Sequence, residues 1–128
     1  YEVIFSGHVT DHRDRPGWLV NVTNDAWYGN SAGPRQHLAA VRLRAVEEGL
    51  PVARAANTGV SIVYDARGHD LGRLEWGIEG VLVRTMPPAL PPTFFAQFGQ
   101  KIPAILCLMA AFIALFPSRS GQRRRSGG

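Results

Sequence analysis

An uncharged apolar run near the C-terminus, residues 102–116, constrains this 128-residue chain more than any other feature. As a helix, its fifteen residues would span about 22 Å, less than the roughly 30 Å hydrocarbon core of a bilayer. Extended back to Phe94, the segment contains 23 residues, and its only polar side chains are two glutamines and Lys101 near one end. We predict a transmembrane helix over residues 94–116, with a buried helix of a soluble protein as the alternative.

The net positive charge of the chain arises from its last ten residues. Four of the fourteen basic residues are the arginines at 119 and 123–125, so the net charge of +4 comes from them and the body is neutral. Positive charge follows a membrane segment on its cytoplasmic side, which predicts a basic cytoplasmic tail over residues 117–128 and places residues 1–92 outside the cytoplasm. No basic face with interleaved aromatic residues is present, which argues against nucleic acid as a partner.

Cysteine usage excludes two other classes of protein. The single cysteine, Cys107, lies within the apolar run, so a disulfide framework is impossible. Zinc-type spacing of cysteine and histidine is absent, and we predict neither a metal nor a cofactor.

Residues 21–33 form the most promising functional segment, because an apolar strand-like run ends in them and a proline then opens a helical pattern. Loops mounted between rigid elements often carry function. Asn24 and Asp25 offer hydrogen-bonding groups, and Trp27 and Tyr28 offer flat apolar surface. We interpret these four residues as substrate-binding, with a well-packed turn as the alternative.

The rest of the chain predicts a layered α+β domain over residues 1–86. Strand-like runs are expected at residues 1–5, 18–22, 52–56, 60–64 and 81–86, a hairpin connection at 66–68, and a helix at 35–48. Four prolines within residues 87–93 predict a stiff connector to the membrane segment.

The charged residues of the predicted helix suggest which of its side chains are buried and which are exposed. At 100° per residue, Arg42 falls among Leu38, Ala39, Ala45 and Val46, with Val41 at the edge of this face. A guanidinium in that position either reaches out to solvent or meets a carboxylate on a neighbouring element, and we predict that Arg42 is buried and paired. Arg44 and Glu48, four residues apart, are expected to form an ordinary exposed pair.

A series of fixed spacings resembles the apolipoprotein N-acyltransferase family, a membrane-bound branch of the nitrilase, or carbon-nitrogen hydrolase, superfamily. The resemblance extends through essentially the whole chain. Its matching positions are Asn24-Asp25-Ala26-Trp27-Tyr28-Gly29, Ser31, Gly33-Pro34, Gln36-His37-Leu38, Arg42, Arg44-Ala45, Glu47, Gly49, Pro51, Arg54-Ala55, Asn57-Thr58-Gly59 and Ser61.

The resemblance implies the C-terminal half of an αββα sandwich that faces the periplasm, followed by the last transmembrane helix of a bacterial inner-membrane enzyme. In the family, a cysteine takes an acyl chain from a phospholipid as a thioester and passes it to the α-amino group of an apolipoprotein's diacylglyceryl-cysteine. That cysteine directly precedes the position of Tyr1, and the general-base glutamate and a lysine lie further upstream. The resemblance thus makes Tyr1 the neighbour of a missing nucleophile and Glu2 a supporting carboxylate, and it implies a fragment that is inactive alone.

Two alternatives remain at this stage. One is an amidase of the nitrilase superfamily that acts on small amides or nitriles. The other is a membrane-anchored, non-catalytic interaction module. The terminal apolar segment argues against the first. The mass of the native polypeptide would separate the enzyme from the second, because the enzyme requires many more residues upstream of Tyr1.

Overall fold

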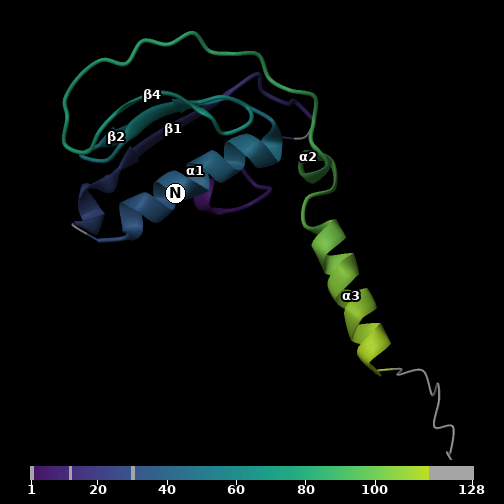
Figure 1. The fold of residues 1–128 in the computed structure, drawn as a ribbon. Coiled ribbons are helices and arrows are strands. Elements are labelled where there is room, and N and C mark those ends of the chain that lie inside the picture. Colours follow the sequence, from purple (N-terminus) through teal and green to yellow (C-terminus); the bar gives the residue numbers. More distant parts are fainter. Residues whose placement is uncertain (1, 12, 30, 116–128) are drawn as a thin grey trace, which may run out of the picture.

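The body of the molecule is one sheet with a long helix on one of its faces (Figure 1). The computed structural model describes residues 2–11, 13–29 and 31–115. Its elements, in chain order, are the 3₁₀ helix η1 (Glu2–Ile4), β1 (Leu19–Asn24), the 3₁₀ helix η2 (Asp25–Tyr28), α1 (Gly33–Glu48), β2 (Val52–Asn57), β3 (Ser61–Tyr64), β4 (Asp70–Leu74), α2 (Phe94–Phe98) and α3 (Lys101–Leu115). This arrangement confirms the α+β class.

The sheet has the order β1-β2-β3-β4 and combines two kinds of pairing. β1 and β2 run parallel and are joined by α1, and β2, β3 and β4 are antiparallel neighbours. In the parallel pair, Asn21 lies opposite Arg54 and Asn24 lies opposite Asn57. The carboxyl ends of β1 and β2 therefore meet at one edge, where η2 and the β2–β3 turn begin.

The hydrophobic core lies between α1 and the inner face of the sheet. Val41 and Ala45 of α1 are fully buried and contact apolar side chains of β2 and β3. Val3 of η1 joins the same cluster, so η1 packs against α1. The buried members of this core are Val3, Val41, Ala45, Val52, Ile62 and Tyr64.

Both ends of α1 follow from its sequence, as predicted. Pro34 occupies the first turn, where its missing N–H costs nothing. Gly49 ends the helix in the left-handed conformation with φ of 65°, and its N–H donates to the carbonyl of Ala45. The predicted hairpin after β3 is also confirmed, with Gly68 at φ of 77°.

Hydrogen bonds to one carboxylate hold that hairpin. Asp65 accepts from the backbone N–H groups of Arg67 and His69, at 2.8 Å each, and from the His69 ring at 2.9 Å. Partial burial acts to raise the pKa of the Asp65 carboxyl, but the hydrogen bonds from His69 and Arg67 outweigh it and lower the pKa. The turn is therefore held by an ionised carboxylate at neutral pH.

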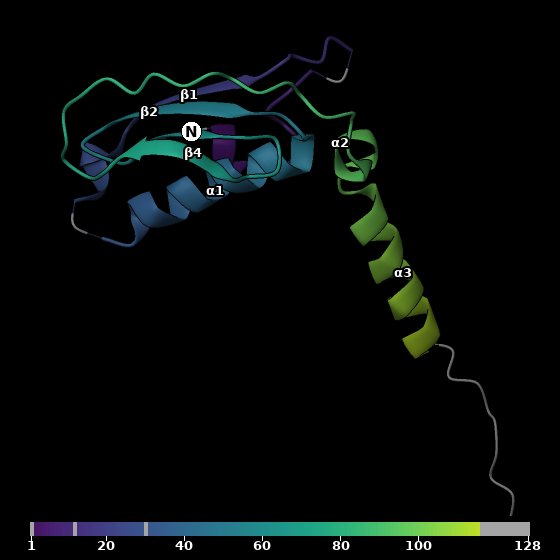
Figure 2. The ribbon, with the colours of Figure 1, turned by 45° about the horizontal axis from the view of Figure 1, so that its top comes forward.

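Two predicted strands are wrong within the described residues. Residues 2–4 form η1 because Phe5 N–H donates to the Glu2 carbonyl and the short run lacks strict alternation of apolar and polar residues. Residues 81–86 form no strand and instead belong to an extended segment that follows β4 and arches over the sheet on the side away from α1 (Figures 1 and 2). The fourth strand is β4, whose polar sequence gave no strand signal.

The predicted orientation of α1 is also wrong. Arg42 is exposed, and its Nε donates to the Gly68 carbonyl at 2.8 Å. The buried arginine of this helix is Arg44, which is 4% exposed and pairs with Glu47 rather than with Glu48, itself buried. Apolar residues occur on every side of α1, including exposed Val46, so the sequence defined no single apolar face.

The C-terminal part departs from the predicted continuous helix over residues 94–116. Gly99, with φ of 55°, separates α2 from α3, and α3 extends away from the sheet and its helix (Figure 2). Among the described residues, no helix combines the length and apolar character that a membrane crossing requires. Phe116 and the predicted basic tail over residues 117–128 lie outside the described residues.

Candidate functional site

The inner face of β1 is unusually polar for a strand next to a core. Burial alternates along the strand, and Leu19, Asn21 and Thr23 turn inward while Val20 and Val22 are exposed. If the strand only had to pack against the core, its valines would face inward and its polar residues would face outward. The polar side chains on the inner face therefore need hydrogen-bond partners, and Arg54 of β2 and Asp25 of η2 supply them.

A buried ion pair between Asp25 and Arg54 lies at the centre of these partners. Asp25 is 1% exposed and follows the last residue of β1. Its Oδ2 accepts from Arg54 Nη2 at 2.5 Å, and its Oδ1 lies 3.1 Å from His37 Nδ1 and 3.4 Å from Thr23 Oγ1. Both carboxylate oxygens are thus engaged inside the protein, and the pair fastens the loop to β2 and α1.

Arg54 carries the network from the loop toward β1. Its side chain is completely buried, its Nη1 donates to Asn21 Oδ1 at 2.5 Å, and its Nε donates to the Val60 carbonyl at 3.3 Å. One guanidinium therefore fixes a side chain of β1, the base of the loop and the turn that leads into β3 at the same time.

The turn between β2 and β3 closes over this ion pair. Gly59 lies so close to Asp25 that a Cβ at this position would overlap Oδ2. Asn57 donates through Nδ2 to Asn24 Oδ1 at 3.2 Å, and Asn24 also accepts from the N–H of Ala26 as the cap of η2. The turn and the loop are therefore parts of one hydrogen-bonded unit.

The two aromatic residues of the loop have different environments. Trp27 is 85% exposed, so its ring is available to a partner. Tyr28 is half-buried, and its ring lies 6.2 Å from that of His37 and directly against Gly33. Tyr28 therefore packs the loop onto the start of α1, while Trp27 projects from it.

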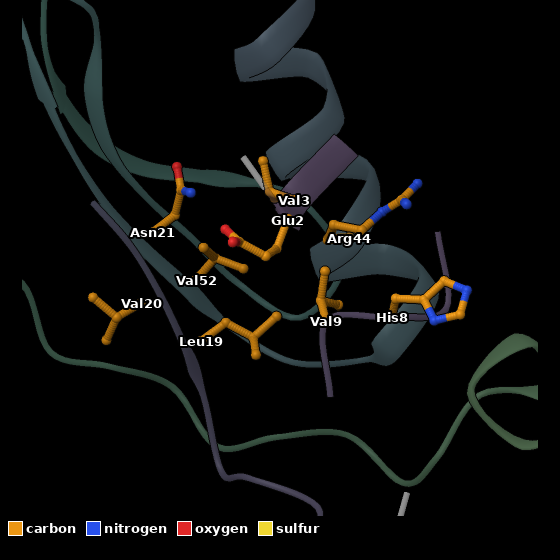
Figure 3. A pocket seen from close by; sticks show the side chains of 9 residues that line it. All are labelled: Glu2, Val3, His8, Val9, Leu19, Val20, Asn21, Arg44 and Val52. Atoms are coloured by element: carbon orange, nitrogen blue, oxygen red, sulfur yellow. The ribbon is translucent and has the colours of Figure 1, made fainter. Parts of the chain in front are cut away.

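A cavity of about 230 Å³ lies on the inner side of the β1 and β2 starts (Figure 3). Its wall is mixed, because apolar side chains alternate with the polar groups of Glu2, His8, Asn21 and Arg44. In Figure 3 the Glu2 carboxylate points toward Asn21 and Val52, whereas the Arg44 guanidinium points away from Glu2. The lining residues are Glu2, Val3, His8, Val9, Leu19, Val20, Asn21, Arg44 and Val52.

The structure brings the predicted site residues together only in part. Glu2 lines the cavity, while the predicted substrate-binding residues of the loop do not line it. The buried Asp25 is linked to the cavity wall through Arg54 and Asn21. Tyr1 lies outside the described residues. The predicted roles of Glu2, Asn24, Asp25, Trp27 and Tyr28 remain predictions.

Sequence reasoning missed the network of Asn21, His37 and Arg54. One signal was available, because Arg54 shares a face of its strand with the buried Val52, and an arginine there requires an acid partner. The partner itself could not be found from spacing, since Asp25 lies 29 residues away in the chain. Within the described residues, no cluster of three histidine, cysteine or acidic side chains could hold a metal ion.

Comparison with known proteins defines the class to which this fold and site belong. Residues 11–90, more than half of the chain, match the carbon-nitrogen hydrolase family. This range includes the loop, the ion pair and all four strands. The chain belongs to the carbon-nitrogen hydrolase family.

Within that family, the chain is similar to proteins named apolipoprotein N-acyltransferase, which confirms the resemblance found in its motifs. It is 48% identical to the protein from Bradyrhizobium diazoefficiens over 90% of the chain and 44% identical to that from Rhodopseudomonas palustris over 93%. It is 36% identical to the protein from Agrobacterium fabrum over 98% of the chain. The chain spans only 21% to 24% of the length of these relatives.

Proposed function

We propose that this chain is the C-terminal part of an apolipoprotein N-acyltransferase. The proposal rests on sequence identity. Over about nine-tenths of its length, the chain is 48% identical to one protein of that name and 44% identical to another. In the proposed reaction, the intact enzyme moves an acyl chain from a phospholipid to the α-amino group of an apolipoprotein's diacylglyceryl-cysteine.

The proposed chemistry needs a cysteine nucleophile that this chain does not supply. In the family that this chain resembles, the nucleophile directly precedes the position of Tyr1, next to Glu2 and its cavity. Cys107 is a poor substitute, because it lies on α3, which extends away from the sheet and its cavity. We assign Glu2 the role of a supporting carboxylate that orients or tunes the nucleophile without bonding to the acyl carbon.

The apolar surfaces support the remaining parts of the proposal. On β1, Val20 and Val22 are 61% and 76% exposed on the face away from α1, a surface suited to the second sheet of an αββα sandwich. On α3, large apolar side chains are exposed around the helix, as expected for a helix in lipid. The proposed location is the bacterial inner membrane, with the catalytic domain in the periplasm and the C-terminus in the cytoplasm.

An amidase of the same superfamily is the second candidate, because the family match covers amide-hydrolysing chemistry as well. The exposed apolar surface of α3 favours the lipid-handling enzyme. A substrate comparison separates the two, since an amidase would release ammonia from small amides and leave a phospholipid unchanged.

The covalent intermediate provides the test. Intact protein incubated with phospholipid labelled in its acyl chain should acquire a hydroxylamine-labile adduct, because thioesters react with hydroxylamine. A Cys107→Ser variant of the intact protein should acquire the same adduct. An adduct that maps to Cys107, or none on any residue, would contradict the proposed function.

A further inference from the structure

A donor–acceptor constraint fixes the orientation of the Asn21 amide. The guanidinium of Arg54 carries only hydrogen-bond donors, so the amide must turn its oxygen toward it. Arg54 Nη1 donates to Asn21 Oδ1 at 2.5 Å, and Arg54 is itself held by Asp25 and by the Val60 carbonyl. Asn21 cannot flip without breaking a hydrogen bond to the buried guanidinium of Arg54, so its N–H₂ group has one defined direction.

That direction is toward the cavity. Asn21 lines the cavity together with Glu2, and in Figure 3 the amide nitrogen of Asn21 lies on the side that faces Glu2, while its oxygen points away. The neighbouring wall combines apolar side chains, including Leu19 and Val52, with the polar side chains of Glu2, His8 and Arg44. An N–H donor held in one direction at the wall of a cavity is suited to bind one acceptor oxygen of a molecule that enters it.

We propose that Asn21 is a specificity residue that binds a carbonyl oxygen of the molecule entering this cavity, and that Arg54 is the positioning residue that orients it. The inference rests on the proposed function. The carbonyl belongs either to the acyl ester of the phospholipid or to a peptide group of the acceptor lipopeptide. Both present the same chemistry to the Asn21 N–H.

An Asn21→Asp substitution separates this role from a structural one. The aspartate keeps an oxygen for Arg54 and preserves the buried contact, but it presents an acceptor to the cavity in place of the donor. If Asn21 served only to satisfy Arg54, the aspartate would serve as well. If it binds a carbonyl, the aspartate repels that oxygen.

The experiment measures the intact protein in its two half-reactions, which are thioester formation from phospholipid and acyl transfer to a diacylated lipopeptide. In Asn21→Asp we expect KM to rise about tenfold for one of the two substrates, and the affected substrate identifies the source of the carbonyl. In Asn21→Thr, whose hydroxyl can still donate, KM should return to within about threefold of the wild type. The Gln36→Glu variant, which adds the same charge at an exposed position of α1, should match the wild type.

Three outcomes would overturn the inference. The first is that both KM values of Asn21→Asp remain within about twofold of the wild type at an unchanged melting temperature. The second concerns the case in which Asn21→Asp does not accumulate. Asn21→Val then replaces it, and equal KM values for the valine and threonine variants would show that the donor is irrelevant.

The third concerns the case in which the wild type transfers no acyl chain. That result by itself contradicts only the proposed function. In that case the inference is tested by equilibrium binding of the lipopeptide and of phospholipid vesicles. The inference fails if Asn21→Asp has the same affinity as the wild type for each of the two ligands, or if the wild type binds neither ligand.

Discussion

Asp25 and Arg54 are the residues on which the loop, α1 and the sheet converge. Their ion pair is almost completely removed from solvent, with side chains 1% and 0% exposed. Removing one partner of such a pair leaves the other charge buried and uncompensated, at a cost of about 3–5 kcal/mol. The stability of the site therefore depends on these residues more than on any exposed charge nearby.

Replacing Arg54 should be far more damaging than replacing Arg42. We expect Arg54→Met in the intact protein to lower the free energy of unfolding by about 3–5 kcal/mol, because Asp25 loses its cation. Arg42→Leu is the matched control, since Arg42 is exposed and makes one hydrogen bond to the Gly68 carbonyl, and it should cost about 1 kcal/mol or less. Denaturant unfolding of both variants checks this, and equal losses would contradict the assignment of the buried arginine.

Glu2 should matter for turnover rather than for folding. It is exposed on η1 and its carboxylate lies at the cavity, so Glu2→Gln removes a charge without disturbing the core. We expect normal accumulation and a fall in turnover of about a hundredfold or more, the usual scale for acid–base and electrostatic support. Glu2→Asp should recover part of the loss. Near-native transfer by Glu2→Gln would make Glu2 a bystander.

At the scale of the elements, the end of α1 is the point where three segments meet. Arg15 Nη2 donates to the carbonyls of Glu48 and Gly49, at 2.7 and 3.3 Å, and to the Leu90 carbonyl at 3.0 Å. Leu90 N–H donates in turn to the Gly49 carbonyl at 2.9 Å. The proline-rich connector is thereby fastened to the helix terminus before α2 begins.

Gly49→Ala should loosen this junction. Gly49 has φ of 65°, and an added Cβ would lie 3.1 Å from Thr93 Cγ2 and 3.3 Å from the Pro91 carbonyl. We expect a loss of stability of about 1–2 kcal/mol from the backbone alone, increased by contact with the connector. Gly77→Ala, at φ of 69° with open space around it, isolates the backbone contribution. Equal melting temperatures for the two variants would show that the connector does not press on Gly49.

The sequence predicted the elements whose ends carry local signals, such as a proline or a glycine. It did not predict the features that depend on pairing between distant segments of the chain. Pro34 and Gly49 define α1, and turn residues define the β3–β4 hairpin. β4 could not be predicted, because a strand of sequence Asp-Leu-Gly-Arg-Leu is specified by its pairing with β3 rather than by propensity. The candidate site was predicted as a loop, but its buried partner Arg54 is set by strand register, which sequence spacing does not reveal.

On the scale of the whole molecule, the charge asymmetry of the C-terminal segment predicts its orientation in a membrane. Four arginines lie in residues 119–125 and the body is neutral, from which the positive-inside rule predicts a cytoplasmic C-terminus. A reporter that is active only in the periplasm should therefore be silent when fused after Gly128 of the intact protein. The same reporter fused to the proline-rich connector, after Pro88, should be active, and the reverse pattern would contradict the predicted orientation.

Acyl transfer by the intact protein tests the central claim most directly. The measurement is the mass of a synthetic diacylated lipopeptide after incubation with intact protein and a phospholipid of defined acyl chains. The account predicts a gain of one acyl chain on the α-amino group, which Glu2→Gln slows. A lipopeptide of unchanged mass, with active hydrolysis of small amides by the same preparation, would contradict it.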